Sequence, residues 1–147
     1  MSEPSTPTVL FICVSNSGKS VMAQGLMRHT AAERIAATSA GTHAKTSVNT
    51  LSAQVLAELG IDISGHQPTQ LDDTLIAAAD LIVILGTQAQ LDRPAGRTPV
   101  EIWDTEEPSL RGIEGIDRMR LIRDDIATRV DELAHRLTAD HQAQPHE

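Results

Sequence analysis

A cysteine, a lysine and several small polar residues share one short segment of this 147-residue chain. Cys13 is the only cysteine, and residues 13–20 read Cys-Val-Ser-Asn-Ser-Gly-Lys-Ser. An apolar run at 9–12, typical of a buried strand, precedes the segment, and a helical pattern begins near Gly18. Backbone N–H groups converge in such a loop and a helix N-terminus adds positive potential. We therefore expect an oxyanion site in which Cys13 acts as a thiolate nucleophile.

The segment fits two loop patterns. One is a thiolate loop, Cys-x5-(Arg/Lys)-Ser, and the other is the nucleotide-binding loop Gly-x4-Gly-Lys-Ser/Thr with Cys13 at its first glycine. The thiolate loop is favoured because a cysteine lacks the conformational freedom that the tight turn of a nucleotide loop uses. The apolar run 81–85 also leads into Gly86, which leaves Asp104 as the remaining candidate to hold Mg²⁺.

Composition excludes several classes of function. A hydrophobic content of 40% and a charged content of 22% are those of a soluble globular domain. The net charge of −8 disfavours nucleic acid and anionic membranes as partners. No apolar run approaches a membrane span, and the first residues lack signal-peptide features, so we expect a cytoplasmic protein. One cysteine and six histidines without metal-ligand spacing predict no metal site.

The expected secondary structure alternates between strands and helices. Apolar patterning predicts strands at 8–13, 34–39, 81–85 and 100–103, and helices at 18–32, 50–59, within 69–79 and at 117–137. This order indicates an α/β fold with three layers, a four-stranded parallel sheet flanked by helices. We expect one domain at 8–138, with disordered tails at 1–7 and 139–147. Cys13 would lie at the carboxyl end of the first strand, where such sheets bind ligands.

Several segments together resemble a known family. Residues 9–24, which contain the loop, are similar to the Cys-x2-Asn-x2-Arg-Ser loop and following helix of the low-molecular-weight protein tyrosine phosphatase superfamily, and more closely to its arsenate reductase branch. Segments 39–42, 48–49 and 60–68 also match, in the same order. The resemblance spans residues 8 to about 137 and implies the fold of that superfamily.

The resemblance also implies roles for the loop. Cys13 is the implied nucleophile, Asn16 holds the loop open through side-chain hydrogen bonds, and Ser20 donates its hydroxyl to the thiolate. The loop amides would bind the oxyanion; they belong to Val14, Ser15, Asn16, Ser17, Gly18, Lys19 and Ser20. Outside the loop, Lys45 could assist an anionic ligand or be an ordinary surface lysine, and His66 is expected to order a turn.

Two departures from the family pattern shape the expected activity. The general acid of the family is an Asp before Pro, and here the aligned residue is Glu107, with Asp104 as the alternative. Lys19 replaces the loop arginine, so the planar pair of N–H donors that suits a phosphoryl group is lost. The chain also has no tyrosine to flank a phosphotyrosine pocket. These departures favour arsenate over phosphate esters; a phosphomonoesterase and a non-catalytic oxyanion-binding module are the alternatives.

The cysteine count bears on the source of electrons. Some arsenate reductases of the superfamily relay a disulfide through two further cysteines, and this chain contains none. The reductant must then be an external low-molecular-weight thiol. The resemblance points to mycothiol with a mycoredoxin, in an arsenate–mycothiol transferase reaction; glutathione with a glutaredoxin-like protein is the alternative. No bound cofactor is expected.

Overall fold

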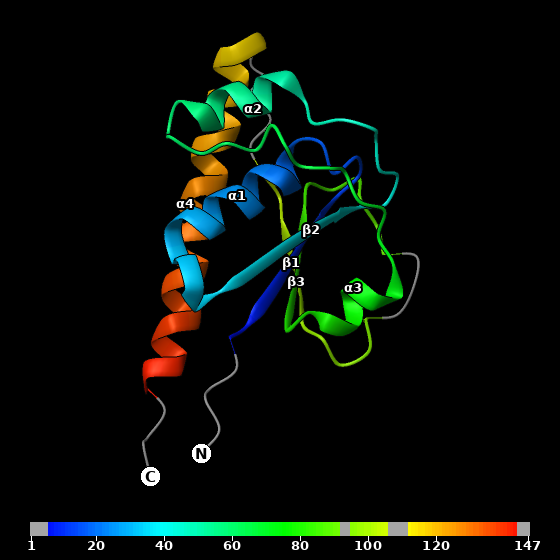
Figure 1. The fold of residues 1–147 in the computed structure, drawn as a ribbon, viewed down its shortest axis with the longest axis vertical. Helices are drawn as coiled ribbons and strands as arrows, with labels where there is room; N and C mark the ends of the chain where they lie inside the picture. The colour runs from blue at the N-terminus through cyan, green and yellow to red at the C-terminus, as the bar shows by residue number, and fades with distance from the viewer. Residues whose placement is uncertain (1–5, 92–94, 106–111, 144–147) are drawn as a thin grey trace.

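The computed structural model describes residues 6–91, 95–105 and 112–143. Its four strands form one parallel sheet in the order β2-β1-β3-β4, with helices on both faces (Figure 1), which confirms the expected α/β fold. The elements in chain order are β1 (Thr8–Cys13), α1 (Lys19–Ala31), the 3-10 turn η1 (Ala32–Arg34), β2 (Ala36–Gly41), α2 (Thr50–Ala57), α3 (Asp73–Ala78), β3 (Leu81–Leu85), β4 (Val100–Trp103) and α4 (Gly115–Ala143).

The central position of β1 follows from its composition. All its residues from Val9 to Cys13 are buried, because the strand pairs with β2 and β3 along its edges and helices cover both faces of the sheet. Strand order reverses between β1 and β3, which makes the carboxyl end of β1 the switch point of the sheet. The only cysteine, Cys13, is the last residue of this strand.

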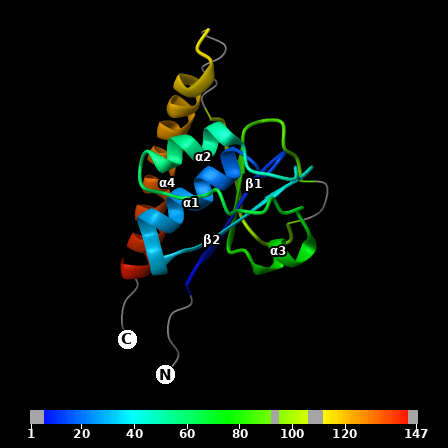
Figure 2. The ribbon, with the colours of Figure 1, turned by 45° about the horizontal axis from the view of Figure 1, so that its top comes forward.

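The two faces of the sheet are covered unequally. Helices α1, α2 and α4 pack on one face over a large apolar cluster that includes Phe11, Val83 and Trp103. The short helix α3 covers the other face over a smaller cluster that includes Ile12 and Ile84. Figures 1 and 2 show the three longer helices together on one side of the sheet and α3 on the other. The alternation of side chains along each strand assigns neighbouring residues to opposite clusters.

Several boundaries differ from the sequence expectations. The second strand lies at Ala36–Gly41 instead of 34–39, because its pairing with β1 continues until Cys13 meets Gly41. Helix α2 ends at Ala57, two residues before the expected end. Helix α4 runs from Gly115 to Ala143, so it starts two residues before the expected start at 117 and ends six residues beyond the expected end at 137. Extending an established helix costs little, and alanine favours it. Residues 1–5 and 144–147 lie outside the described residues.

None of the helices in the described ranges combines the length and the apolar character needed to cross a membrane.

Candidate functional site

The backbone of the 13–20 loop is fixed by the segment that follows β2. N–H groups of residues 42, 43, 45 and 49 donate to the loop carbonyls of Cys13, Val14, Ser15 and Ser17, at 3.1, 2.8, 2.9 and 2.8 Å. Each of these bonds holds a loop carbonyl toward residues 42–49. The loop is therefore organised before any ligand binds, which is a requirement for a preformed oxyanion cradle.

Close packing against Gly41 completes the support of the loop. A Cβ atom at this position would lie 2.6 Å from the Val14 carbonyl oxygen and 2.9 Å from the Asn16 amide nitrogen. Contacts this short with backbone atoms are not tolerated, so only glycine lets the loop cross the end of β2 at this distance. The sequence pattern did not reveal this role, although a glycine at the end of a strand is a signal of close backbone approach.

The Cys13 thiol lies at the base of the loop with two polar partners. Its Sγ atom is 3.0 Å from Ser20 Oγ and accepts a hydrogen bond from the Asn16 amide at 3.3 Å. Ser20 Oγ also accepts a hydrogen bond from Asn16 Nδ2 at 2.8 Å, which leaves its own proton available for the sulfur. Both partners can therefore donate a hydrogen bond to the sulfur. The geometry is that of a nucleophile stabilised within its own loop.

Asn16 is the side chain that connects the loop to the rest of the protein. It is fully buried and adopts a positive φ of 49°, a conformation that asparagine tolerates better than most residues. Its Oδ1 atom accepts hydrogen bonds from the Thr69 amide at 2.8 Å and from His66 Nε2 at 2.9 Å. With the bond to Ser20, the side chain therefore joins three separate points of the structure.

His66 has a second role beyond ordering its own turn. Its backbone N–H donates to the Ile63 carbonyl at 3.1 Å, and its ring contacts Asn16. Asn16 Oδ1 is an acceptor, so His66 Nε2 carries the proton in this bond. Burial lowers the pKa of His66, and the positive charge of Arg28 lowers it further. The structure therefore favours a neutral imidazole that donates to the loop.

The N-terminus of α1 is open toward the loop. Its N-cap is Gly18, which has no side chain to satisfy the first amides of the helix. Lys19 opens the helix, and its Nζ atom would lie 3.6 Å from a Cβ atom built at Gly86, which places the ammonium group beside the end of β3. A lysine in the first turn is electrostatically unfavourable unless an anion compensates it. This arrangement suits a bound oxyanion.

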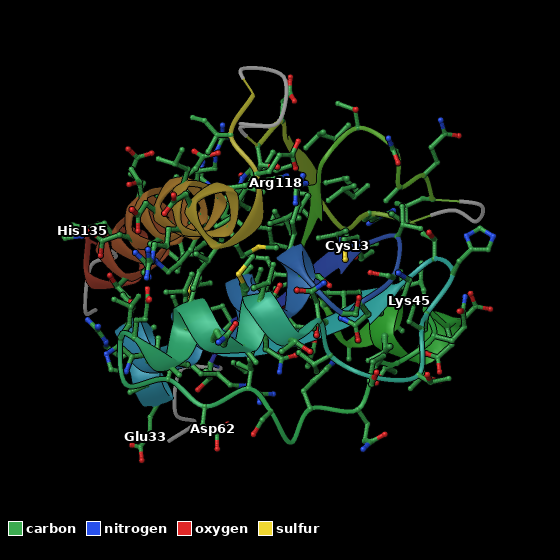
Figure 3. All side chains as sticks on the ribbon, turned by 90° about the horizontal axis from the view of Figure 1, so that it is seen from above. Cys13, Glu33, Lys45, Asp62, Arg118 and His135 are labelled. Atoms are coloured by element: carbon green, nitrogen blue, oxygen red, sulfur yellow. The ribbon has the colours of Figure 1, made fainter. Side chains whose placement is uncertain are left out.

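A pocket of about 640 Å³ opens above the loop. Its lining residues come from the loop and from three other parts of the chain; they are Cys13, Val14, Ser15, Ser17, Gly18, Lys19, Lys45, Asn49, Ser52, Leu85, Gly86, Thr87, Gln88, Ala89, Asp104, Thr105, Arg118, Met119 and Ile122. In Figure 3, Cys13 lies between Arg118, at the start of α4, and Lys45, on the segment after β2. The pocket is thus wide enough for a tetrahedral oxyanion and part of a second reactant.

The structure places most of the predicted site residues around this pocket. Lys45 and Asp104 line it, whereas the loop residues Asn16 and Ser20 are fully buried and do not line it. Glu107, the aligned general acid, lies outside the described residues. Sequence reasoning missed Arg118, which lay inside an amphipathic helix pattern with no local signal of function. No group of His, Cys, Asp or Glu side chains within the described ranges is arranged to hold a metal ion.

Comparison with known proteins agrees with this geometry. Over residues 8–143, the chain matches the family described as low molecular weight phosphotyrosine protein phosphatase. An arsenate reductase of Staphylococcus aureus (strain Newman) is 33% identical over 117 residues, which cover 77% of this chain and 87% of the relative. Arsenate reductase 1 of Staphylococcus epidermidis is 31% identical over 134 residues, covering 88% and 97%.

Solved structures show the same fold. A thioredoxin-dependent arsenate reductase of Corynebacterium glutamicum has a TM-score of 0.74 and 29% identity, and the match covers 92% of this chain but 63% of that one. An arsenate reductase in a phosphate-binding state has a TM-score of 0.77 and 28% identity, covering 88% and 98%. At 22% identity, an arginine phosphatase of Geobacillus stearothermophilus shares the fold, with a TM-score of 0.76. With the thiol loop at the switch point of its sheet, the chain belongs to the low molecular weight phosphotyrosine protein phosphatase family.

Proposed function

We propose that this protein is an arsenate reductase in which the Cys13 thiolate attacks arsenate. The observation that carries the proposal is the position of Cys13 Sγ, which faces an open pocket and has two hydrogen-bonding partners that favour the thiolate. The curated arsenate reductases at 31–33% identity support arsenate as the substrate. Lys19 supports the same substrate, because a point charge suits a phosphoryl transition state less well than the guanidinium of the family loop.

The first step of the proposed reaction forms an S–As bond. The Cys13 thiolate attacks arsenic(V), one As–O bond breaks, and the departing oxygen is protonated and leaves as water. The product is a Cys13–S–As(V) adduct. The loop amides and the uncapped N-terminus of α1 stabilise the negative charge that remains on the arsenate oxygens.

The proton for the departing oxygen comes from a carboxylic acid in this proposal. Glu107 aligns with the family acid, and Asp104 lines the pocket, with its backbone carbonyl held by Arg129 Nη2 at 3.0 Å. Comparing Glu107→Gln with Asp104→Asn identifies the acid. We expect Glu107→Gln to lower kcat by 10²- to 10⁴-fold, in the general range for removal of a general acid. Full activity of Glu107→Gln together with loss of activity in Asp104→Asn would assign the role of general acid to Asp104.

The electrons come from outside the chain in this proposal. With Cys13 as its only cysteine, the chain cannot pass a disulfide between its own residues. We propose mycothiol as the second reactant. Its thiolate forms a bond to arsenic as the Cys13 S–As bond breaks. A mycoredoxin thiolate then attacks the mycothiol sulfur, the S–As electron pair reduces arsenic(V) to arsenite, and the two sulfurs form a mixed disulfide.

The test is an arsenite-production assay with purified protein and three donor systems. These are mycothiol with mycoredoxin, glutathione with glutaredoxin, and thioredoxin with its reductase; the last matters because the Corynebacterium neighbour is described as thioredoxin-dependent. We expect turnover with mycothiol and mycoredoxin, and none with thioredoxin. Turnover with glutathione alone would change the carrier but keep the mechanism. Arsenate binding without turnover in any system would indicate a non-catalytic oxyanion-binding module.

A phosphomonoesterase is the second candidate, and the family match favours it. The same thiolate and the same amides could attack and hold a phosphate monoester. Hydrolysis of p-nitrophenyl phosphate without added thiol measures this activity. Because Lys19 lacks the planar pair of donors, we expect hydrolysis to be slow and to rise in Lys19→Arg. Fast hydrolysis by the unaltered protein would favour the phosphatase over the reductase.

A further inference from the structure

We propose that Arg118 binds the outer oxygens of the oxyanion and supplies the guanidinium that the loop lacks at Lys19. The inference deepens the proposed function, since it rests on this pocket holding arsenate or phosphate. It assigns a binding role to a residue of α4 that lies almost one hundred residues from the loop in sequence.

The position of Arg118 is fixed by contacts of its neighbour. Ser52 Oγ donates a hydrogen bond to Met119 Sδ at 3.6 Å, and the same oxygen would lie 3.6 Å from a Cβ atom at Gly18. The first turns of α4 therefore reach the N-terminus of α1 through a single intervening side chain. Arg118 lines the same pocket as Cys13 and lies on the α4 side of it, as Figure 3 shows.

The charge of the pocket contrasts with that of the chain. The protein carries a net charge of −8, yet Lys19, Lys45 and Arg118 all line this one pocket. Arg118 lies close to the N-terminus of α4, where the helix dipole disfavours a cation and favours an anion. A dianionic ligand between the ends of α1 and α4 would interact favourably with both helix dipoles and with the three cations.

Thr105 provides an independent indication of a ligand. It lines the pocket and is 6% exposed, and within the described part of the chain its Oγ1 atom has no hydrogen-bond partner. Buried hydroxyl groups are almost always hydrogen-bonded, so an unpartnered one beside a pocket indicates a missing acceptor. An oxyanion held between the loop and Arg118 offers such an acceptor on the wall formed by Thr105.

Lys19 and Arg118 would bind the oxyanion in different ways. Lys19 presents a compact charge beside Gly86, close to the loop amides. A guanidinium presents parallel N–H donors that match two oxygens of a tetrahedral anion. Arg118 therefore restores bidentate recognition from the opposite side of the pocket, while Cys13 keeps an open approach to the central atom.

The test measures binding of phosphate and of arsenate by titration calorimetry, without any thiol. We expect Arg118→Gln to weaken both affinities at least tenfold, and Arg118→Lys to recover only part of the loss. Arg120→Gln is the matched control, because it removes the same charge from the same helix at a residue that does not line the pocket and whose Nη2 atom lies 2.6 Å from Glu58. Equal affinities of Arg118→Gln and Arg120→Gln would overturn the proposal.

A second pair of variants tests whether Arg118 compensates for the lysine at position 19, so the proposal does not depend on one substitution alone. In a Lys19→Arg background the loop regains its own guanidinium, so Arg118→Gln should then weaken phosphate binding by less than threefold. If Arg118→Gln still weakened phosphate binding tenfold in that background, Arg118 would not be compensating for the missing loop guanidinium. Far-ultraviolet circular dichroism and thermal unfolding confirm that each variant folds. Because the assay measures binding alone, absence of arsenate reduction would reject the proposed function without affecting this result.

Discussion

The two walls of the pocket are built in different ways. The wall formed by the 13–20 loop is held by backbone hydrogen bonds from residues 42–49 and by the buried side chain of Asn16. The opposite wall combines the exposed residues Thr87 and Gln88 with Asp104, Thr105 and Arg118. Its side chains come from separate segments of the chain, and Thr105 keeps an unpartnered hydroxyl within the described part of the chain.

This difference separates two tasks. A thiolate and an oxyanion can share one loop only if its amides point in fixed directions, so the loop wall is structured in advance. In the proposed reaction, the opposite wall would meet the outer oxygens, the departing oxygen and the external thiol.

Replacing the nucleophile should have the largest effect. In Cys13→Ser, we expect arsenite production to fall by at least about 10³-fold, because a serine hydroxyl cannot form the S–As adduct. Phosphate affinity should change little, since the loop amides remain. Arsenite measured under saturating mycothiol and mycoredoxin checks the first result, and calorimetry checks the second. Retention of full activity would show that Cys13 is not the nucleophile.

Gly41→Ala tests whether the loop wall needs its support. The added Cβ meets backbone atoms of Val14 and Asn16 at less than 3.0 Å, so the loop must shift. We expect a loss of about 3 kcal/mol in the free energy of unfolding, at the upper end for overpacking, together with a large loss of activity. Gly65→Ala is the control, because nothing lies within 4 Å of its Cβ position. Urea unfolding measures the stability of both variants. Similar stabilities would show that a side chain is tolerated where the loop crosses the end of β2.

Asn16→Ala removes the side chain that joins the loop to Ser20, His66 and Thr69. We expect about 2 kcal/mol of destabilisation, because buried donors lose their acceptor. Asn16→Gly has the same loss but tolerates the positive φ, so the difference between the two variants isolates the backbone strain.

A variant of the opposite wall is the comparison for Asn16. Thr87→Ala should change the free energy of unfolding by less than about 0.5 kcal/mol, as for other exposed positions. Denaturant unfolding measures all three variants under one set of conditions. An effect of Thr87→Ala as large as that of Asn16→Ala would erase the contrast between the two walls.

The smallest expected effect is on the pH dependence of the folding stability. Because the pKa of His66 is lowered in the folded protein, the unfolded chain binds a proton more readily. The stabilisation from neutral His66 is thus fully present above about pH 6.5, and it declines as the pH falls through the lowered pKa. The bond to Asn16 survives protonation, because Nε2 keeps its proton.

A variant without a titrating ring at this position checks the assignment. Between pH 7.5 and 5.5, Tm should fall less in His66→Gln than in the unaltered protein, and His135→Gln, on an exposed part of α4, should behave like the unaltered protein. Identical pH profiles for His66→Gln and the unaltered protein would remove His66 as the cause.

Local sequence predicted the elements that carry strong patterns. The strand expected from the continuous apolar run at 81–85 is confirmed as β3, because burial on both faces is a property of a few adjacent residues. The predicted end of the second strand, at residue 39, was wrong, because pairing with β1 extends β2 to Gly41. The extent of α4 was also wrong, because its last turns depend on helix propagation beyond the apolar repeat.

The sequence by itself determined which residue of this protein can carry thiol chemistry. One cysteine between a buried strand and a helix start predicts a nucleophile in an anion-binding loop, and the absence of any other cysteine excludes an internal disulfide relay. Tertiary structure alone decided what surrounds that thiol: Gly41 beneath the loop, His66 behind it and Arg118 across the pocket. These residues are distant in the chain, and their roles follow from packing distances, which local residue patterns do not encode.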